Sequence, residues 1–543
     1  MTHKDYLWLF AIALLVRLLA AWPQEQPNYM DAAYYYVNAV NLVEGRGFVE
    51  DFVWNYLNDP GPPPQPSHLY WMPLTSLLAA AGMLLGGINY RAAQVAFVLL
   101  AALLAPISYR VAWRLSGGDR WLSWLAGLLA VFSGFYVAYW AAIDNFAPFA
   151  VAGSLALLLA AEAATQGSRG AGEQGSRGKF RNSQFTIRNS QLLLAGVMAG
   201  LAHLSRADGV LILVTIELFL FMNWMGKRGW GDTPQAPRPA ALVWPLLGYL
   251  LTMLPWFIRN WQVAGAPLPA GGTQAIWLSD YNDLFSYGRE LSAATFLAQG
   301  WGAILAGRWL ALITNLQTVV AAWGLIVAAP LAAIGGWARR RDGLVQLAAL
   351  YGLLLFGAMT LLFPFPGMRG GLFHSGAALL PFVFGAAAVG LDVAINWMAR
   401  RRRGWRVQSA RRVFGVALVL IAAGLSLFLY NQRVLRHDVW NRADAGYPAL
   451  IAWVQAQNPA AVVMIGNPPA WRYHGGGLSV ITPNEDPPTT QAAARRYGVR
   501  YLILDRNHPP PLAELYRQPD SAPGLRLVEQ FGDTLIFEVG SKE

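Results

Sequence analysis

The chain has 543 residues, of which 55% are hydrophobic and only 13% are charged, and its mean hydropathy is +0.34. This composition is too apolar for an ordinary soluble enzyme and indicates a multi-pass membrane protein. The formal net charge of +11 does not indicate a nucleic-acid partner, because the basic clusters lie between apolar runs. Without cysteine the chain has no disulfide, no thiolate metal site and no cysteine nucleophile.

About eleven apolar runs are long enough to cross the hydrocarbon layer, which is about 30 Å thick and takes roughly 20 helical residues. The run at 191–205 is the shortest and needs its flanks to span. These runs predict an all-helical membrane domain over residues 1–435. In chain order they are 6–22, 91–113, 121–141, 146–164, 191–205, 208–225, 241–258, 311–336, 343–363, 372–397 and 413–430.

A twelfth apolar run, 69–87, is expected to lie on the outer surface as an interfacial helix. With that placement and a cytoplasmic N-terminus, every strong basic cluster falls in a cytoplasmic loop. We therefore predict a protein of the plasma (inner) membrane with its N-terminus in the cytoplasm. The clusters are Arg110/Arg114/Arg120, Arg169 to Arg188, Lys227/Arg228, Arg339 to Arg341 and Arg400 to Arg412.

Two segments depart from the apolar pattern. Residues 165–190 repeat GSRG and RNSQ, and this composition cannot bury a core, so we expect a disordered cytoplasmic insert. The pattern after about residue 436 changes to short strand-like runs near 461–467, 499–505 and 525–540, separated by helix-like stretches. These runs predict a small α/β domain over 436–543, outside the cytoplasm because an odd number of crossings precedes it.

The long first outer loop carries the first acidic candidate, Asp31, in NYMDAAYYYVNAVNLVEGRGFVEDF (28–52). This stretch predicts an amphipathic helix with Asp31 one turn from Tyr34 and at the membrane boundary. The second candidate, Asp144, lies in YWAAIDNFAPF (139–149), at the outer end of a helix pair. An acid beside apolar helix ends usually has a function. The alternatives are a solvated loop acid or, for Asp144, a helix N-cap.

Isolated basic residues are expected at outer helix ends on the same side. They are Arg206 in HLSRADG, Arg259 in PWFIRN, and Arg369 and His374 in PGMRGGLFHSG. Because the cytoplasmic charges are massed in clusters, single outer arginines indicate a local anion, and the guanidinium group suits phosphate by geometry. The alternative is that these side chains extend to lipid headgroups.

At these residues the sequence resembles the GT-C class of integral-membrane glycosyltransferases. The resemblance covers most of the chain and rests on Asp31 with the following AAYYYVNAVNLVEGRGF, the His68 segment before the interfacial helix, Asp144, GLAHLSRADG (200–209) and PWFIRN. It implies a GT-C-like bundle, a polyprenyl-phosphate-linked sugar donor, an outer acceptor and a C-terminal domain packed over the site. The C-terminal domain lacks a WWD-type motif, which argues against sequon glycosylation.

The resemblance gives these residues roles in a transfer reaction. Such a reaction needs a base for the acceptor hydroxyl, which Asp31 would supply, and positive charge on the phosphate, which Arg206 or Arg259 would supply. Direct displacement would invert the anomeric carbon. Tyr34, His68, Arg369 and His374 are expected to help to bind substrate. No cofactor is certain, but a divalent cation (Mg or Mn) bridging Asp31, Asp144 and the phosphate is an alternative source of positive charge.

Two other kinds of protein are alternatives to a glycosyltransferase. A lipid or solute transporter or flippase would carry ionisable residues near the bilayer midplane and an internal repeat of the spans, and neither is visible in the sequence. A membrane scaffold would leave the long first loop and its acids unexplained. The expected partners are the polyprenyl-phosphate donor, membrane lipids and a protein, lipid or glycan acceptor, and nucleic acid is not expected.

Overall fold

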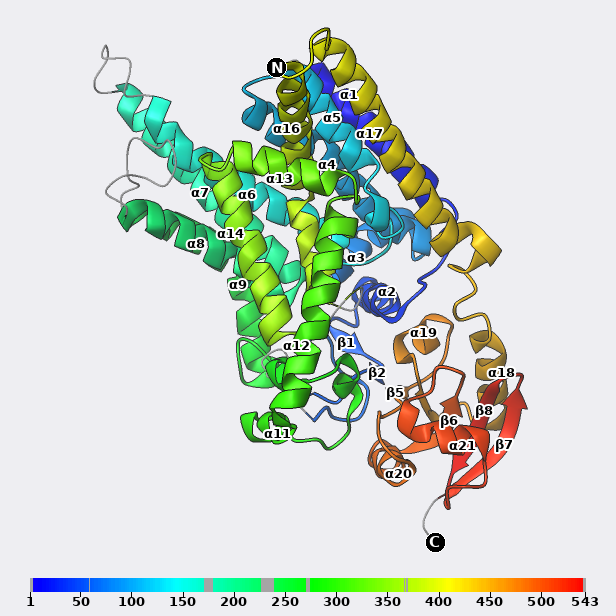
Figure 1. Ribbon diagram of the computed structural model, residues 1–543. Helices are drawn as coiled ribbons and strands as arrows, with labels where there is room; N and C mark the ends of the chain where they lie inside the picture. The colour runs from blue at the N-terminus through cyan, green and yellow to red at the C-terminus, as the bar shows by residue number, and fades with distance from the viewer. Residues whose placement is uncertain are drawn as a thin grey trace.

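The computed structural model describes residues 3–57, 59–169, 179–225, 239–269, 274–365, 367 and 370–540. A helical body makes up most of the molecule, and a small domain with a sheet lies at one end of it (Figure 1). Within the described residues, eight helical stretches are long and apolar enough to cross a membrane. The chain is therefore a multi-pass membrane protein, although the predicted number of eleven spans is not confirmed.

Most predicted runs form helices close to their expected places. The helices α1 and α7 are not among the eight apolar stretches, and α7 packs between α6 and α9. The long helices are α1 (His3–Ala21), α4 (Tyr90–Ser116), α6 (Phe146–Arg169), α7 (Lys179–Ser205), α8 (Val210–Met225), α9 (Val243–Ala264), α12 (Gly300–Gln317), α14 (Gly343–Gly357), α16 (Leu380–Ala399) and α17 (Val407–Tyr430).

Two predicted spans are not continuous helices. The run 121–141 forms α5 (Arg120–Val131) and then an irregular segment that contains the turn η1 (Gly134–Tyr136). The run 311–336 is split between α12 with its π-helical end η6 (Thr318–Trp323) and α13 (Ala328–Ala338). Leu325, between the two pieces, has a φ of 49° and is buried against Gly134, so the two irregular segments pack together. Hydropathy could not reveal these breaks because the broken segments remain apolar.

The first loop, between α1 and α4, contains two helices, α2 (Met30–Val43) and α3 (Leu74–Gly86), which pack against each other. The run 69–87 was predicted to be an interfacial helix, and α3 within it has 13 residues. At 1.5 Å per residue it is too short to cross about 30 Å of hydrocarbon.

Helix extends into the predicted insert 165–190 from both sides. The helix α6 continues to Arg169, and α7 begins at Lys179. Residues 170–178 lie outside the described residues, so the predicted disorder of the insert stays a prediction.

The C-terminal domain contains a six-stranded sheet of order β2-β5-β4-β6-β8-β7. Neighbouring strands are parallel from β2 to β6 and antiparallel beyond β6. The predicted strand runs contain four of these strands, whereas β5 was not predicted. The edge strand β2 comes from the first loop and so lies outside the domain boundary predicted at 436. The strands are β2 (Phe52–Val53), β4 (Val462–Ile465), β5 (Ser479–Ile481), β6 (Val499–Leu504), β7 (Leu525–Phe531) and β8 (Thr534–Val539).

Helix α2 lies between the helical body and the C-terminal domain (Figure 1). Ala33 of α2 is part of the C-terminal core, and the ring of Tyr36 contacts the ring of Tyr473 in α19 (Pro468–Tyr473) at 5.1 Å between centroids. The helix that carries Asp31 is therefore held by both parts of the molecule.

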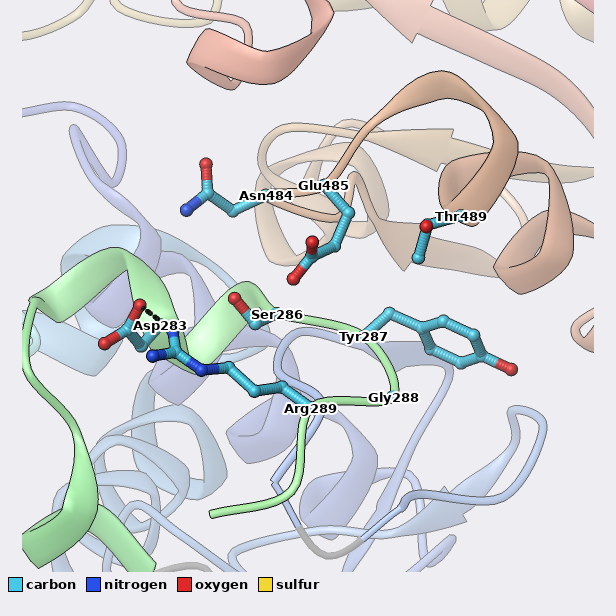
Figure 2. Close-up of a pocket in the computed structure, with 8 residues that line it drawn as sticks. All are labelled: Asp283, Ser286, Tyr287, Gly288, Arg289, Asn484, Glu485 and Thr489. Carbon is cyan, nitrogen blue, oxygen red and sulfur yellow. Dashed lines mark hydrogen bonds and ion pairs between the residues drawn. The ribbon is translucent and has the colours of Figure 1, made fainter. Parts of the chain in front are cut away.

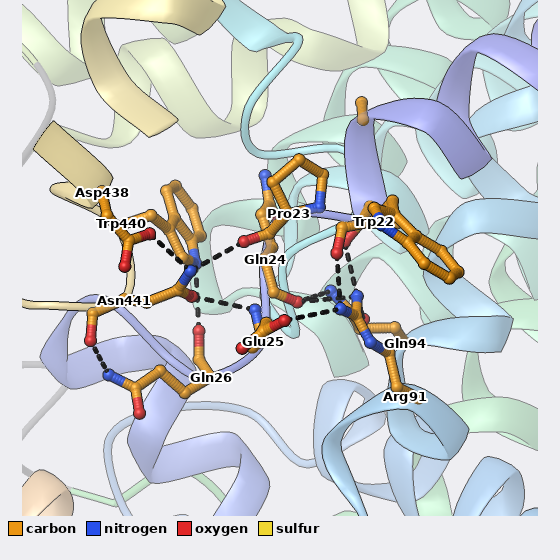
Figure 3. Close-up of polar contacts among 12 residues, drawn as sticks. Trp22, Pro23, Gln24, Glu25, Gln26, Arg91, Gln94, Asp438, Trp440 and Asn441 are labelled. Carbon is orange, nitrogen blue, oxygen red and sulfur yellow. Dashed lines mark hydrogen bonds and ion pairs between the residues drawn. The ribbon is translucent and has the colours of Figure 1, made fainter. Parts of the chain in front are cut away.

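The segment that leads into α2 is held from two sides (Figure 3). On one side, the Asn441 side chain accepts a hydrogen bond from the backbone N–H of Glu25 at 2.9 Å and donates one to the carbonyl of Pro23 at 2.8 Å. On the other side, the Arg91 guanidinium donates to three backbone carbonyls of residues 21–24. These contacts fix the start of α2 against both α4 and the connector to the C-terminal domain.

A carboxylate shared by two arginines joins the first loop to the C-terminal domain. The Asp51 side chain, 9% exposed, accepts hydrogen bonds from Arg46 at 2.5 and 2.7 Å and from Nε of Arg472 in α19 at 2.9 Å. The two guanidinium groups hold the pKa of Asp51 below its usual value although burial opposes them. The ionised carboxylate thus links two segments that are far apart in the sequence.

We expect Asp51→Asn to lower the free energy of unfolding by about 1–3 kcal/mol, because two guanidinium groups lose their charged partner. The connector around 431–446 should also be cleaved faster by trypsin in the detergent-purified protein. Asp533→Asn is the matched control, since its ion pair with Arg506 is exposed and should contribute at most about 1 kcal/mol. Equal cleavage rates in the two variants would show that Asp51 does not hold the domain.

Candidate active site

Two acids and one histidine from separate segments meet at the start of α2. Asp31 lies in the first turn of α2, Asp144 ends the irregular segment before α6, and His374 lies in the short helix α15 (Gly371–Ser375). One carboxylate oxygen or ring nitrogen from each residue lies within 4.8 Å of the others. The acids predicted to share one side of the membrane therefore share one site.

Asp144 is fully buried and held by two donors. The Tyr29 hydroxyl, just before α2, donates to Oδ2 at 2.7 Å, and the Asn145 backbone N–H donates to Oδ1 at 2.6 Å. The bond from Tyr29 ties the Asp144 carboxylate to the start of the helix that carries Asp31. Asp144 therefore has a fixed orientation toward the neighbouring acid.

Burial and mutual repulsion make this a site for positive charge. Burial, followed by the charge of Asp144, raises the pKa of Asp31, and burial raises the pKa of Asp144. Arg206 acts in the opposite direction on both carboxyl groups. Two close carboxylates, that of Asp144 buried and that of Asp31 partly buried, favour a proton, a cation or a guanidinium group between them.

Arg206 follows the end of α7 in an extended conformation and is held by an acid that the sequence analysis missed. Its Nε donates to Asp208 at 3.0 Å, and the Ser375 hydroxyl donates to the other oxygen of Asp208 at 2.6 Å. Asp208 thus joins Arg206 to the helix of His374. Its only signal in the sequence was its place two residues after Arg206.

His374 presents one ring nitrogen toward the acids. Its ring stacks on Phe146 at 4.3 Å between centroids, and its Nδ1 lies 3.1 Å from the carbonyl of Gly370. When Nδ1–H donates to that carbonyl, the lone pair is left on Nε2, which is the usual arrangement of a metal-binding histidine. Two carboxylates and one neutral imidazole suit a divalent cation such as Mg, Mn or Zn. Asp31, Asp144 and His374 therefore fit the divalent cation that the sequence analysis gives as an alternative source of positive charge.

The other loop residues predicted to bind substrate form a buried cluster beside the acids. The Tyr34 hydroxyl accepts a hydrogen bond from the His68 backbone N–H at 2.7 Å, and both ring nitrogens of His68 lie within 3.0 Å of serine hydroxyls. Burial lowers the pKa of His68 to about 3, so the imidazole is neutral. Its contacts hold the first loop together.

Arg259 is directed into the same loop. Its Nη2 donates to the carbonyl of Ser67 at 2.8 Å, and its guanidinium lies 4.8 Å from the ring centre of Trp256. Of the predicted site residues, Asp31, Asp144, Arg206 and His374 lie together, and Tyr34, His68 and Arg259 form the adjacent cluster. Arg369 lies outside the described residues.

Glu50 is a buried acid of this cluster that the sequence analysis did not single out. It is 4% exposed, and its Oε1 accepts a hydrogen bond from Gln65 at 2.9 Å. Burial raises its pKa to about 8, while Arg259 acts in the opposite direction. No local signal marked it, because Glu50 and Asp51 look alike in the sequence. Glu50 differs in lying in β1 (Val49–Glu50), which pairs with β3 (Gln65–Pro66).

This pKa predicts a pH dependence of stability. Between the ordinary value near 4.5 and about 8 the folded protein keeps the Glu50 proton that the unfolded chain has released. The contribution of Glu50 to the free energy of unfolding is therefore greatest below about pH 4.5 and decreases as the pH rises to about 8. Glu50→Gln should unfold like the wild type at about pH 5 and at a higher temperature than the wild type at about pH 8.5. If the unfolding temperatures of Glu50→Gln and the wild type differed by the same amount at both pH values, this prediction would be wrong.

The comparisons with known proteins identify the fold. No protein-family model and no curated protein sequence matches the chain. Among solved structures, the chain is similar to the Archaeoglobus fulgidus oligosaccharyltransferase AglB in complex with an inhibitory peptide and a dolichol-phosphate, with a TM-score of 0.58 and 13% identity over 92% of this chain and 69% of that one.

It is also similar to ArnT from Cupriavidus metallidurans. The match covers 99% of this chain and 98% of the ArnT chain, at 13% sequence identity. The TM-score is 0.56 for the apo state and 0.55 for the state bound to undecaprenyl phosphate. These structural neighbours are GT-C glycosyltransferases. The predicted resemblance to that class is therefore confirmed at the level of the fold.

Proposed function

We propose that this protein is a membrane glycosyltransferase that moves a sugar from a polyprenyl-phosphate donor to an acceptor on the outer side of the membrane. The observation that carries the proposal is the meeting of Asp31, Asp144, His374 and Arg206 at one site. The fold supports it, because one neighbour was solved with a dolichol-phosphate and another with undecaprenyl phosphate. The acceptor belongs to one of three classes: protein, lipid or glycan.

Asp31 takes the proton of the acceptor hydroxyl in the proposed reaction. The acceptor oxygen then forms a bond to the anomeric carbon, and the bond from that carbon to the phosphate oxygen breaks. Arg206 balances the charge that develops on the departing phosphate, and this direct displacement inverts the anomeric carbon. Asp144 orients Asp31 and Tyr29.

Asp31, Asp144 and His374 are the residues that would hold a divalent cation, which would supply positive charge to the phosphate. An AglB structure was solved with Zn and sulfate, which supports testing for a metal in this protein. A chelator should lower the transfer rate if these residues hold the cation, and added Mn or Mg should restore it.

The proposal is tested by transfer of labelled sugar from polyprenyl-phosphate donors in purified membranes. A screen of lipid extracts identifies the donor. Label that stays on the lipid with every donor and acceptor fraction would contradict the proposal and favour a transporter.

The orientation can be checked by labelling single cysteines, because the chain has no native cysteine. Ser409 is an exposed residue in the first turn of α17, and Ser521 is an exposed residue of the C-terminal domain. A cysteine at Ser521 should react with a membrane-impermeant maleimide in cells whose outer layers admit it. A cysteine at Ser409 should react only after the membrane is opened. The reverse pattern would place Asp31 on the cytoplasmic side.

A further inference from the structure

A cavity of about 600 Å³ opens between an outer loop of the helical body and the C-terminal domain (Figure 2). One wall is the loop after the short helix η5 (Tyr281–Phe285), and the other is the start of α20 (Pro487–Arg496) with the residues before it. The Asn484 backbone N–H donates to the carbonyl of Phe285 at 2.9 Å and joins the two walls. None of the residues placed in the active site lines this cavity.

Polar side chains without protein partners face the cavity from both walls. Ser286 comes from the loop, and Asn484 and Glu485 come from the C-terminal domain. Figure 2 shows the Glu485 carboxylate directed toward the loop that carries Ser286, whereas the Asn484 amide points to the side. Among the described residues, no side-chain hydrogen bond or ion pair involves Ser286, Asn484 or Glu485. A hydroxyl, an amide and a carboxylate are thus free to bind a ligand.

A fixed aromatic ring completes the lining. Tyr287 makes edge contacts with Tyr56 at 5.3 Å and with Tyr497 at 6.4 Å between ring centroids. The nearby Arg289 is paired with Asp283 at 2.6 Å, which balances its charge. Because this ion pair is neutral, the Glu485 carboxylate is the one unpaired charge among the residues that line the cavity.

This lining distinguishes between kinds of ligand. A phosphate or other anion would face the free carboxylate of Glu485, and a hard metal cation would find one free carboxylate where it usually binds several oxygen ligands. A peptide is usually bound through an open strand edge or apolar side-chain pockets, and the polar lining offers neither. Adjacent sugar hydroxyls both donate and accept hydrogen bonds, which matches a carboxylate, an amide and a hydroxyl. The C–H face of a sugar ring can pack on an aromatic ring such as that of Tyr287.

We propose that this cavity binds a neutral, hydroxyl-rich carbohydrate. The volume lies within the range of about 300–1,000 Å³ that is typical of ligand sites. Phe285 and Met30, the residue before Asp31, pack against the same core of the C-terminal domain, so the cavity and the carboxylate site border one core. Identification of this carbohydrate as the acceptor's sugar chain rests on the proposed function, whereas the binding itself does not.

The test uses the full-length, detergent-purified protein with Ser286→Cys as its single cysteine. Ser286→Cys is nearly isosteric and places a thiol in the cavity wall. Its maleimide labelling rate is measured with a panel of neutral di- to hexasaccharides built from hexose, pentose and N-acetylhexosamine units. At a concentration about ten times Kd, a bound oligosaccharide should slow labelling roughly tenfold. Ser521→Cys, at an exposed position that does not line the cavity, is the control and should label at an unchanged rate.

Two further substitutions decide whether the cavity itself causes the protection. Adding Glu485→Gln, which keeps the size of the side chain, or Tyr287→Ala should weaken oligosaccharide binding by about tenfold, so that the same concentration slows labelling only about twofold. Arg506→Ala on the exposed surface should leave it unchanged. Protection by no oligosaccharide, protection that survives both substitutions, or protection by a peptide panel instead would overturn the proposal. Protection without any sugar transfer would contradict only the proposed function, and transfer without protection would contradict only this inference.

Discussion

Replacement of Asp31 by asparagine should lower sugar transfer by on the order of 10² to 10⁴ while the protein still folds. Asparagine keeps the shape and hydrogen-bonding capacity of the side chain but cannot accept a proton at neutral pH. Because Asp31 lies beside Asp144, a neutral side chain at this position also avoids repulsion between the two acids, so stability should not fall. The measurement is transfer by purified variants of matched monodispersity and unfolding temperature.

Asp144→Asn provides the comparison for this prediction. Asp144→Asn should lower the rate of sugar transfer less than Asp31→Asn does if Asp144 only orients its neighbours. It should lower the rate about as much if both acids hold a cation. An Asp31→Asn enzyme that retains more than about a tenth of the wild-type turnover would remove Asp31 from the role of base.

Arg206→Ala should lower transfer by about 10² to 10³, because the departing phosphate loses its charge partner inside a buried site. Arg206→Lys should recover only part of the rate, since an ammonium group lacks the planar fork that binds two phosphate oxygens. Donor binding should weaken as well. The readouts are single-turnover transfer and the donor concentration at half-maximal rate.

Asp208→Asn separates phosphate binding from positioning. Asp208 touches Arg206 and Ser375, so it acts through Arg206, and its replacement should reduce donor binding less than Arg206→Ala does. Unchanged donor binding and rate in the Arg206→Ala enzyme would leave Arg206 with a structural role only.

The part of the fold that could be predicted from the sequence is the part that depends on local pattern. Apolar runs marked the membrane helices, and strand-like runs marked four strands of the C-terminal sheet. The break at Leu325 could not be predicted, because it depends on packing against the turn at Gly134. The pairing of β2 with β5 could not be predicted either, because it joins two segments that lie more than four hundred residues apart.

The candidate site shows the same division. Asp31 and Asp144 were found because an acid at an apolar helix end is unusual, and the structure brings them together. Asp208 and Glu50 were missed because their importance depends on partners from distant segments, Ser375 for Asp208 and Gln65 on the paired strand for Glu50. Burial, which changes the chemistry of each of these acids, is a property of the assembled fold.

The most direct test of the central claim is a balance of donor and product in proteoliposomes that contain only this protein. With the identified polyprenyl-phosphate sugar and acceptor fraction, the account predicts that free polyprenyl phosphate and glycosylated acceptor appear in equal amounts. Neither product should form with the Asp31→Asn protein. Movement of the intact donor across the bilayer without cleavage of its sugar–phosphate bond would contradict the account.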